Sequence, residues 1–132
     1  MYNIETKNQV SENCKRIARA LPELARLALY RAGLFVQAES QKRTPVDTGY
    51  LRSSAKTRME SDYAVLIGYE ASYAIFVHER TNLKHKVGEA KFLQNAMDKN
   101  KRQIRKILEK TIIDGERRIL RKWKNMKMLL PE

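Results

Sequence analysis

The segment 44–54 reads Thr-Pro-Val-Asp-Thr-Gly-Tyr-Leu-Arg-Ser-Ser, and it constrains the fold more than any other stretch of the chain. Pro45 cannot donate a backbone hydrogen bond, and it disfavours the helical conformation of the residue before it. Asp47 and Thr48 can accept hydrogen bonds from nearby amides, and Gly49 permits a positive φ angle. A helix that arrives from the N-terminal side must therefore end before Pro45, and the chain must turn.

Apolar residues before this turn recur at helical spacing. Their positions are Val10, Cys14, Ile17, Leu21, Leu24, Leu27, Ala28, Leu34 and Ala38. This spacing is typical of an amphipathic helix, and Pro22 is tolerated in a first helical turn. We expect one kinked helix or two consecutive helices, with residues 1–20 as a mobile N-terminal helix or arm. Gly33 is either a tolerated surface glycine or a site of close packing against a neighbouring subunit.

After the turn, two stretches are typical of strands. Residues 63–70 are rich in β-branched and aromatic side chains, have the length of a strand and follow the turn-forming segment 60–62. Residues 53–60 alternate loosely and are expected to pair with them as a hairpin. Because both faces of the 63–70 strand are apolar, we expect it to be central in its sheet or covered on both sides, in part by another subunit.

One helical pattern dominates the C-terminal part of the chain. The apolar positions are Phe92, Ala96, Ile104, Leu108, Ile112, Ile119, Trp123, Met126 and Leu130. They predict a long amphipathic helix, with a bend or break at 114–115. A helix of about 35 residues spans about 50 Å, so residues 115–132 are expected to form an overhanging extension whose apolar stripe is not fully buried in its own subunit. Before it, residues 72–79 fit a strand or a helix, and 80–88 read as a projecting loop.

The chain is strongly basic, since 27 Lys and Arg against 15 Asp and Glu give a net charge of +12. Residues 91–128 hold 13 basic residues and four acidic ones. Such a field suits nucleic acid, an acidic protein surface or an anionic membrane, or it is a solvated helix face. A length of 132 residues corresponds to a single domain, 1–132, and the lone Cys14 excludes an internal disulfide. The sequence contains no apolar run of the length of a membrane span and no signal-peptide pattern.

Residues that carry chemistry form no recognised constellation. The sequence has no Gly-rich phosphate loop, no Gly-x-Ser-x-Gly elbow and no His-Glu-x-x-His helix. His78 beside Glu79, with His85 as a second ligand, lacks a third ligand, so a partly buried His with a hydrogen-bonding partner is favoured. Asp47 and Arg52 could pass for a catalytic pair, but a carboxylate in this setting is typical of a turn or helix-cap acceptor. We expect no enzyme activity, no cofactor and no metal.

Three blocks of the sequence together resemble one family. Residues 44–54 carry Pro-Val-Asp-Thr-Gly-x-Leu-x-x-Ser, residues 72–79 carry Tyr-Ala followed by apolar residues and a Glu, and residues 88–97 carry Ala-x-Phe-Leu. In this order and at this spacing, the blocks resemble the tail components and the tail-completion or neck proteins of tailed phages. Two positions depart from the family pattern: Lys91 stands where proline is common, and Arg80 stands where glycine is common.

Pattern and resemblance together predict an α+β fold. It has N-terminal helices, a small antiparallel sheet or hairpin, a short helix over 72–79 and a long C-terminal amphipathic helix. The resemblance implies a structural protein of the virion neck or tail, assembled in the host bacterial cytoplasm as a ring of six or twelve copies around the DNA channel. Its neighbours would be head-closure or connector proteins and tail-terminator or tail-tube proteins, with DNA passing through unread and no membrane involved. The alternative is a small basic nucleic-acid-binding protein whose 91–127 helix lies along phosphates.

The resemblance selects the motif positions, and the loop pattern and helix length select the interface positions. The structural motif positions are Pro45, Asp47, Thr48, Gly49, Leu51, Arg52, Tyr73, Ala74, Phe76, Glu79, Phe92 and Leu93. The candidate assembly-interface positions are Arg80, Lys84, His85, Lys86, Ile119, Trp123 and Met126. We expect Leu51 to anchor the core, and Arg52 to pair with a carboxylate inside the subunit or across the ring. The loop 80–88 is expected to contact a neighbouring ring. The residues expected to seat the short helix and the start of the last helix on the sheet are Tyr73, Phe76, Phe92 and Leu93.

Overall fold

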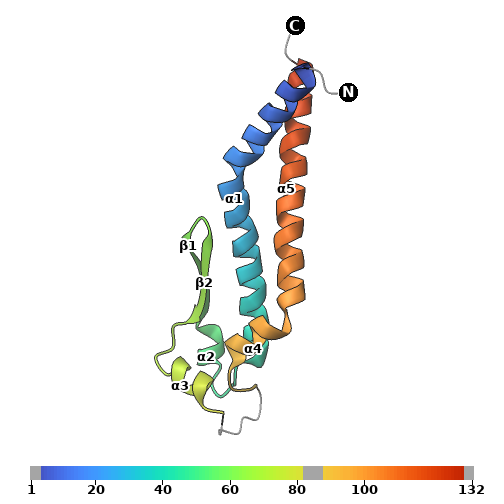
Figure 1. Cartoon of the computed structure of the whole chain (residues 1–132). Helices are drawn as coiled ribbons and strands as arrows, with labels where there is room; N and C mark the ends of the chain where they lie inside the picture. The colour runs from blue at the N-terminus through green and yellow to red at the C-terminus, as the bar shows by residue number, and fades with distance from the viewer. Residues whose placement is uncertain (1–3, 82–87, 130–132) are drawn as a thin grey trace.

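The structure, a computed structural model, describes residues 4–81 and 88–129. Its elements are α1 Ile4–Arg43, α2 Tyr50–Ser53, β1 Ala55–Ser61, β2 Ala64–Tyr69, α3 Ala74–Glu79, α4 Phe92–Lys99 and α5 Lys101–Leu129. The expected α+β class is therefore confirmed. The long helices α1 and α5 run side by side, the β-hairpin packs along α1, and the short helices gather at one end (Figure 1).

The molecule has two structurally different ends, the corner and the arm. The corner is the end at which α2, α3 and α4 meet the last turns of α1 and the base of the hairpin. The arm is the opposite end, where the first half of α1 lies beside the second half of α5 (Figure 1). The start of α1 and the end of α5 lie together at the tip of the arm.

α1 is one helix of 40 residues with Pro22 inside it. Proline cannot donate to the carbonyl four residues earlier, and its ring crowds that carbonyl, so proline bends a helix. The ribbon is bent in its N-terminal part (Figure 1). Of the two alternatives, the single kinked helix is correct, and residues 4–20 continue it. The helix ends at Arg43, before Pro45, as predicted.

The hairpin has only two strands, paired antiparallel from Ala55 opposite Tyr69, with an irregularity between Met59 and Ser61. The prediction that the 63–70 strand is central in its sheet is wrong, because among the described residues β2 pairs with β1 alone. Its cover on one face comes from α1, and Leu66 on the other face is exposed.

Gly33 brings α1 and the hairpin into close contact. A Cβ at this position would lie 2.8 Å from Cγ2 of Thr57 and 2.9 Å from Cγ2 of Val65. Both neighbours are β-branched and therefore stiff. Gly33 is thus a close-packing glycine, but its partner is the hairpin of its own chain and not a second subunit.

The C-terminal helical segment is broken at Asn100 and not at 114–115, so the predicted position of the break is wrong. The Asn100 side chain donates to the Ala96 carbonyl at 2.8 Å, which competes with helix continuation, and α5 begins at the next residue. Gly115 lies inside α5 and is buried against Leu24, whose Cδ2 occupies the space that an added Cβ would need. Close packing therefore explains this glycine. The described part of the expected overhang, residues 115–129, lies beside α1 in the arm, where Ile119 and Trp123 are half-buried and Met126 is exposed. That this segment forms an overhanging extension stays a prediction.

Candidate assembly surfaces

The family motif starts where α1 ends, and Gly49 sets its backbone geometry. Gly49 has a φ of 86°, in the left-handed region that glycine favours, and α2 starts directly after it. Thr48 Oγ1 accepts a hydrogen bond from the Tyr50 N–H at 3.3 Å. Asp47 is exposed, and its carboxylate bonds to no described residue. Thr48 therefore provides the acceptor that the sequence assigned to Asp47 as well.

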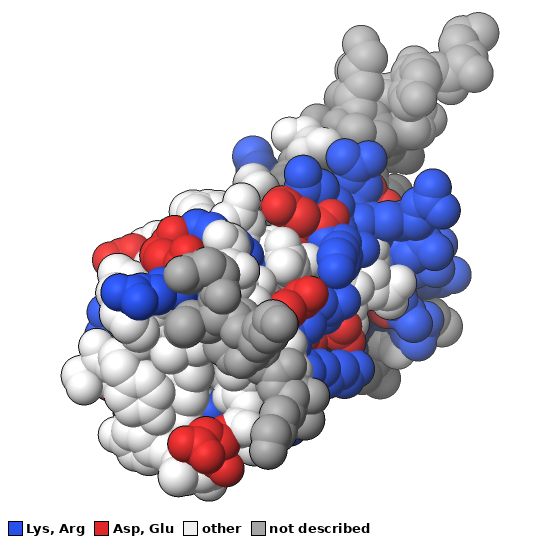
Figure 2. Space-filling view, turned by 90° about the horizontal axis from the view of Figure 1, so that it is seen from below, with Lys and Arg blue, Asp and Glu red and all other residues white. Residues whose placement is uncertain are grey.

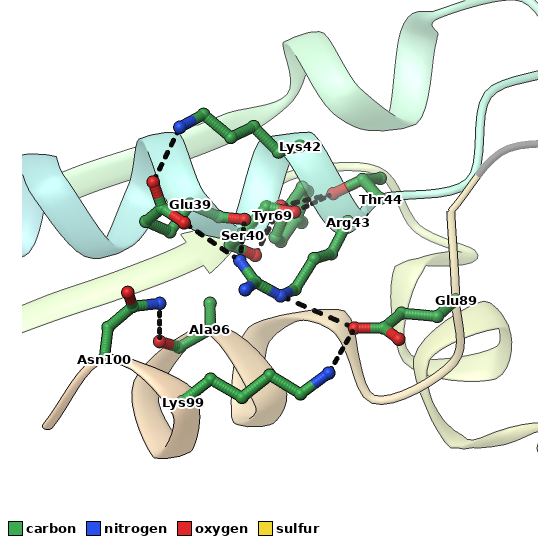
Figure 3. A network of polar contacts seen from close by, with 10 residues as sticks. All are labelled: Glu39, Ser40, Lys42, Arg43, Thr44, Tyr69, Glu89, Ala96, Lys99 and Asn100. Atoms are coloured by element: carbon green, nitrogen blue, oxygen red, sulfur yellow. Dashed lines mark hydrogen bonds and ion pairs between the residues drawn. The ribbon is translucent and has the colours of Figure 1, made fainter.

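Three hydroxyl groups tie the end of α1 to β2 (Figure 3). The Tyr69 hydroxyl lies 2.7 Å from Ser40 Oγ and 2.6 Å from Thr44 Oγ1, and Thr44 donates to the Ser40 carbonyl at 2.8 Å. Ser40 therefore donates to Tyr69, and Tyr69 donates to Thr44. Ser40 and Thr44 are fully buried, so these bonds satisfy polar groups that water does not reach. Sequence reasoning missed this network. One sequence signal could have indicated it: Ser40 and Thr44 are small hydroxyl residues four positions apart, and they continue the helix face that carries the buried Val36.

The segment that leads into α4 is fastened to the same end of α1. The Glu89 N–H donates to the Arg43 carbonyl at 2.8 Å, and the Glu89 carboxylate lies 3.5 Å from Arg43 Nε and 3.8 Å from Lys99 Nζ (Figure 3). Gly88 has a φ of 91° and approaches the backbone of Pro45 so closely that an added Cβ would lie 2.5 Å from its nitrogen. Only glycine fits this position without a shift of backbone.

Glu39 supplies a second carboxylate to Arg43. It accepts a hydrogen bond from Lys42 at 2.7 Å and one from Arg43 at 3.1 Å (Figure 3). These bonds, that of Lys42 first, hold the pKa of the Glu39 carboxyl below its usual value of 4.5. Arg43 therefore links Glu39, within α1, to Glu89 at the entry of α4.

Arg52 does not pair with a carboxylate among the described residues. Its Nη2 donates to the Thr44 carbonyl at 3.1 Å, and its own carbonyl accepts from Gln41 Nε2 at 3.0 Å. The Arg52 side chain thus binds the backbone that α1 leaves unsatisfied at its C-terminal end. The predicted ion pair within the subunit is wrong for this reason, and pairing across a ring stays a prediction.

The four residues expected to seat α3 and α4 divide into two pairs. Phe92 is 1% exposed, and with Leu93 beside it belongs to the cluster around Leu51. Ala74 from α3 is buried in the same cluster. Tyr73 and Phe76, in contrast, are 43% and 48% exposed, so the expectation that they seat α3 is wrong. A six-residue helix has room for one buried face only, and Ala74 and Val77 occupy it.

The exposed side of α3 forms an apolar surface that we call the α3 patch. It consists of Tyr50, Tyr73, Ile75 and Phe76. Ile75 is 76% exposed and Tyr50 is 58% exposed, and the rings of Tyr50 and Tyr73 lie 6.3 Å apart. Seen from the corner end, the side that carries α3 shows a wide face without charged atoms, whereas Lys and Arg collect on the opposite side (Figure 2).

A second apolar surface lies on α1 and β1, away from the corner. We call it the α1 groove. Its lining residues are Glu23, Arg26, Leu27, Tyr30 and Met59, around a volume of about 570 Å³. Leu27 and Tyr30 are each about two-fifths exposed, and Leu34 continues the same apolar face one turn further along.

The backbone geometry of Lys91 explains why this position departs from the proline of the family pattern. Its φ is 55°, and its N–H donates to the His78 carbonyl at 2.7 Å, and proline permits neither. The Lys91 ammonium also pairs with Glu79, and this bond, followed by one with His78, lowers the pKa of the Glu79 carboxyl. His78 Nδ1 lies 2.9 Å from Glu79, and its ring packs edge-on against Phe92. His78 is thus a partly buried histidine with a hydrogen-bonding partner, the arrangement that the sequence favoured.

The predicted interface residues are only partly placed. Lys84, His85 and Lys86 lie outside the described residues. Arg80 is exposed, has extended backbone with a φ of −82°, which needs no glycine, and stacks over the Phe76 ring at 4.0 Å. In α5, Met126 is exposed, whereas Ile119 and Trp123 are half-buried, with Arg16 of α1 lying over the Trp123 ring.

His, Cys, Asp and Glu side chains are scattered over residues 4–81 and 88–129. No group of three or more His, Cys, Asp or Glu there could hold a metal ion. In the same part of the chain, no helix combines the length and the apolarity that crossing a membrane requires.

The fold and its surfaces define a class of small α+β protein whose exposed features are apolar contact surfaces and a basic helix. Within that class, the family model described as "Bacteriophage HK97-gp10, putative tail-component" matches residues 8–78, which are 71 of the 132 residues. The chain therefore belongs to this HK97 gp10-like family of phage tail components, which is a family of structural proteins and not of enzymes. The match includes the first motif block, 44–54, and the second block as far as His78, whereas Glu79 and 88–97 lie beyond it. Searches of curated proteins and of solved structures found no significant match.

Proposed function

We propose that this tail component acts in the neck of the virion, where copies of the chain form a ring at the head-to-tail junction around the DNA channel. Rings of six or twelve copies are the forms that the family resemblance implies. Head-closure or connector proteins lie on one side of such a ring and tail-terminator or tail-tube proteins on the other.

The observation that carries this proposal is the presence of two separate apolar surfaces on one chain. The α3 patch projects from the corner, and the α1 groove is recessed between α1 and β1. Transfer of a large apolar side chain, such as that of Ile75 or Phe76, from water into a buried site is favourable by about 1.5–3 kcal/mol when burial is complete. A protein that leaves several of them together at its surface commonly uses them for association.

Two different surfaces on one chain suit a ring because they allow a heterologous contact, in which one surface of a copy binds the other surface of the next copy. A chain that grows by such contacts keeps one free site of each kind, one at each end. These two sites bind each other and close a ring if the rotation permits. In our proposal, Ile75 and Phe76 of one copy enter the α1 groove of the next.

Charge supports the same pairing. Arg80 borders the α3 patch, where it stacks on Phe76. The α1 groove is bordered by Arg26 as well as by Glu23, and Glu23 is the one that can pair with Arg80. The side chains of Arg80 and Glu23 are both exposed, and neither makes an ion pair with another described residue. Contact between the two surfaces would bring these opposite charges to the same rim, which favours the correct register.

The test uses one variant for each surface. Ile75→Asp breaks the α3 patch, and Tyr30→Asp breaks the α1 groove. Each variant alone should sediment as a monomer under conditions in which the wild-type protein forms rings. Ser11→Asp, which adds the same charge at an exposed position of the arm, should still form rings.

A mixture of the two variants gives the sharper result. The intact patch of Tyr30→Asp can bind the intact groove of Ile75→Asp, but neither product can extend further. An equimolar mixture should therefore form heterodimers and nothing larger. Rings formed by either variant alone, or a mixture that stays monomeric, would show that these surfaces do not bind each other.

A further inference from the structure

The outer side of α5 carries a line of basic side chains that the proposed ring contacts leave unused. We call it the basic stripe. Its members are Lys106, Lys110, Arg117, Arg121 and Lys124, and all five are exposed. None of them makes an ion pair with another described residue; in the described part of α5, only Lys101 does so, with Asp98 of α4.

Helical geometry places these five residues on one face. At 3.6 residues per turn, their spacings of four, seven, four and three keep them within about 60° of one another around the helix axis. From Lys106 to Lys124 the stripe runs for about 27 Å at 1.5 Å per residue. Glu109 and Glu116 point well away from this face, and only Asp114 borders it.

A line of cations on a rigid helix matches a line of anions. The phosphates of duplex DNA provide one negative charge per about 1.7 Å of helix axis, so a stripe of this length has many phosphates within reach. α5 is held in place along α1, so the basic side chains start from a fixed backbone.

The residue composition of the basic stripe favours phosphates over a protein surface as its binding partner. The buried centre of a protein interface is enriched in aromatic residues and Arg and depleted of Lys, whereas three of the five stripe residues are Lys and none is aromatic. Trp123, the one aromatic residue of α5, is packed under Arg16 and is not free to reach a partner. Exposed Lys and Arg that remain solvated while neutralising phosphates are typical of DNA-backbone binding.

We propose that the basic stripe of α5 binds the phosphate backbone of duplex DNA without reading its sequence. Five phosphate contacts give a slope of about −4.5 for log affinity against log salt concentration, which is a loss of about 500-fold between 50 and 200 mM salt. The same affinity is expected for duplexes of unrelated sequence, because no side chain of the stripe is placed on a recognition element for base edges.

The experiment measures binding of the full-length protein to a fluorescently labelled duplex of about 30 base pairs by anisotropy across this salt range. The stripe variant Lys110→Gln, Arg117→Gln, Arg121→Gln removes three contacts and should reduce the slope to about −1.8. The matched control Arg31→Gln, Lys56→Gln, Arg58→Gln removes the same charge from exposed positions on α1 and β1 and should leave the slope unchanged. Thermal melting of both variants verifies that they fold.

Three outcomes would overturn the proposal. The stripe variant could keep the full slope, or the control could lose as much as the stripe variant, which would make binding an effect of net charge. Polyglutamate could displace the duplex as well as unlabelled DNA does at equal charge, which would indicate an acidic protein partner. This inference does not depend on the ring, because Ile75→Asp, which should not assemble, is expected to retain the slope per chain.

Discussion

The corner and the arm of this molecule are held together by different kinds of contact. In the corner, the backbones of α1, the motif loop and the entry to α4 approach directly, through the Gly88 contact with Pro45 and the bond from Glu89 to Arg43. In the arm, α1 and α5 meet through side chains, with Leu24 against Gly115 and Arg16 over Trp123. Side chains can move to accept a change, whereas adjoining backbones cannot. The corner should therefore tolerate much less substitution than the arm.

The largest difference is expected when an aromatic ring is removed from each region. Phe92→Ala empties the centre of the corner, where the ring is almost fully buried, and should lower the free energy of unfolding by about 3–5 kcal/mol. Trp123→Ala in the arm removes a half-buried ring and should cost about half of that. Urea denaturation of both variants measures the two values. Equal losses would mean that the arm is packed as rigidly as the corner.

A pair of glycines isolates the effect of backbone contact. Gly88→Ala and Gly49→Ala impose the same strain, because both positions have a φ near 90°, at 91° and 86°. Gly88 meets backbone atoms, whereas no atom lies within 4 Å of a Cβ at Gly49. We expect a loss of about 3 kcal/mol or more for Gly88→Ala and about 1 kcal/mol for Gly49→Ala, from thermal or urea unfolding. A smaller loss at Gly88 than at Gly49 would contradict the corner geometry.

In the arm, Gly115→Ala should change stability by less than about 1 kcal/mol. The new methyl group displaces the Leu24 side chain, and the gain in helix propensity of about 1 kcal/mol offsets that cost. The measurement is the midpoint of urea unfolding, with Gly88→Ala as the reference from the corner. A loss as large as that of Gly88→Ala would show that Leu24 has no alternative rotamer and that the arm is as fixed as the corner.

The smallest expected effect depends on pH. The Glu39 pKa is lower in the folded protein than its usual 4.5, so its stabilisation is present above that value and is lost as pH falls through the folded-state pKa. Glu39→Gln should lower the free energy of unfolding by about 0.5 kcal/mol at pH 7, with the difference from wild type vanishing in acid. Glu12→Gln, which removes the exposed pair with Lys15 in the arm, serves as the control. A difference for Glu39→Gln that persists below pH 3 would rule out the ion pairs as its cause.

Local signals in the sequence predicted the backbone of the corner but not its side-chain contacts. The end of α1, the turn at Gly49 and the hairpin depend on neighbours in the chain, so proline, glycine and β-branched residues were sufficient to place them. The two faces of α3 could not be assigned in this way, because Ile75, Phe76 and Val77 are all apolar and only the fold decides which one is buried.

Glycines with distant partners were the main source of error. The sequence predicts a break at Gly115 because the residues near it in the chain do not reveal its contact with Leu24, 91 residues earlier. For the same reason, the sequence does not decide whether Gly33 is a surface glycine or a close-packing glycine. Its partners Thr57 and Val65 are on the hairpin, far from it in the sequence. The network of Ser40 and Thr44 with Tyr69 is equally non-local, although two hydroxyl residues on a buried helix face are a signal that can be used elsewhere.

The pairing of α1 with α5 also determines the order in which the chain can fold during translation. A ribosome adds about 5–20 residues per second, so α1 leaves it several seconds before α5 exists. Until then the buried side chains Leu24 and Ala28 have no α5 to cover them. The nascent chain can form the hairpin against Gly33 first and must wait for its last 30 or so residues to close the arm. A product released early by premature termination would retain the hairpin and expose this face, which makes it a natural substrate for chaperones and proteases.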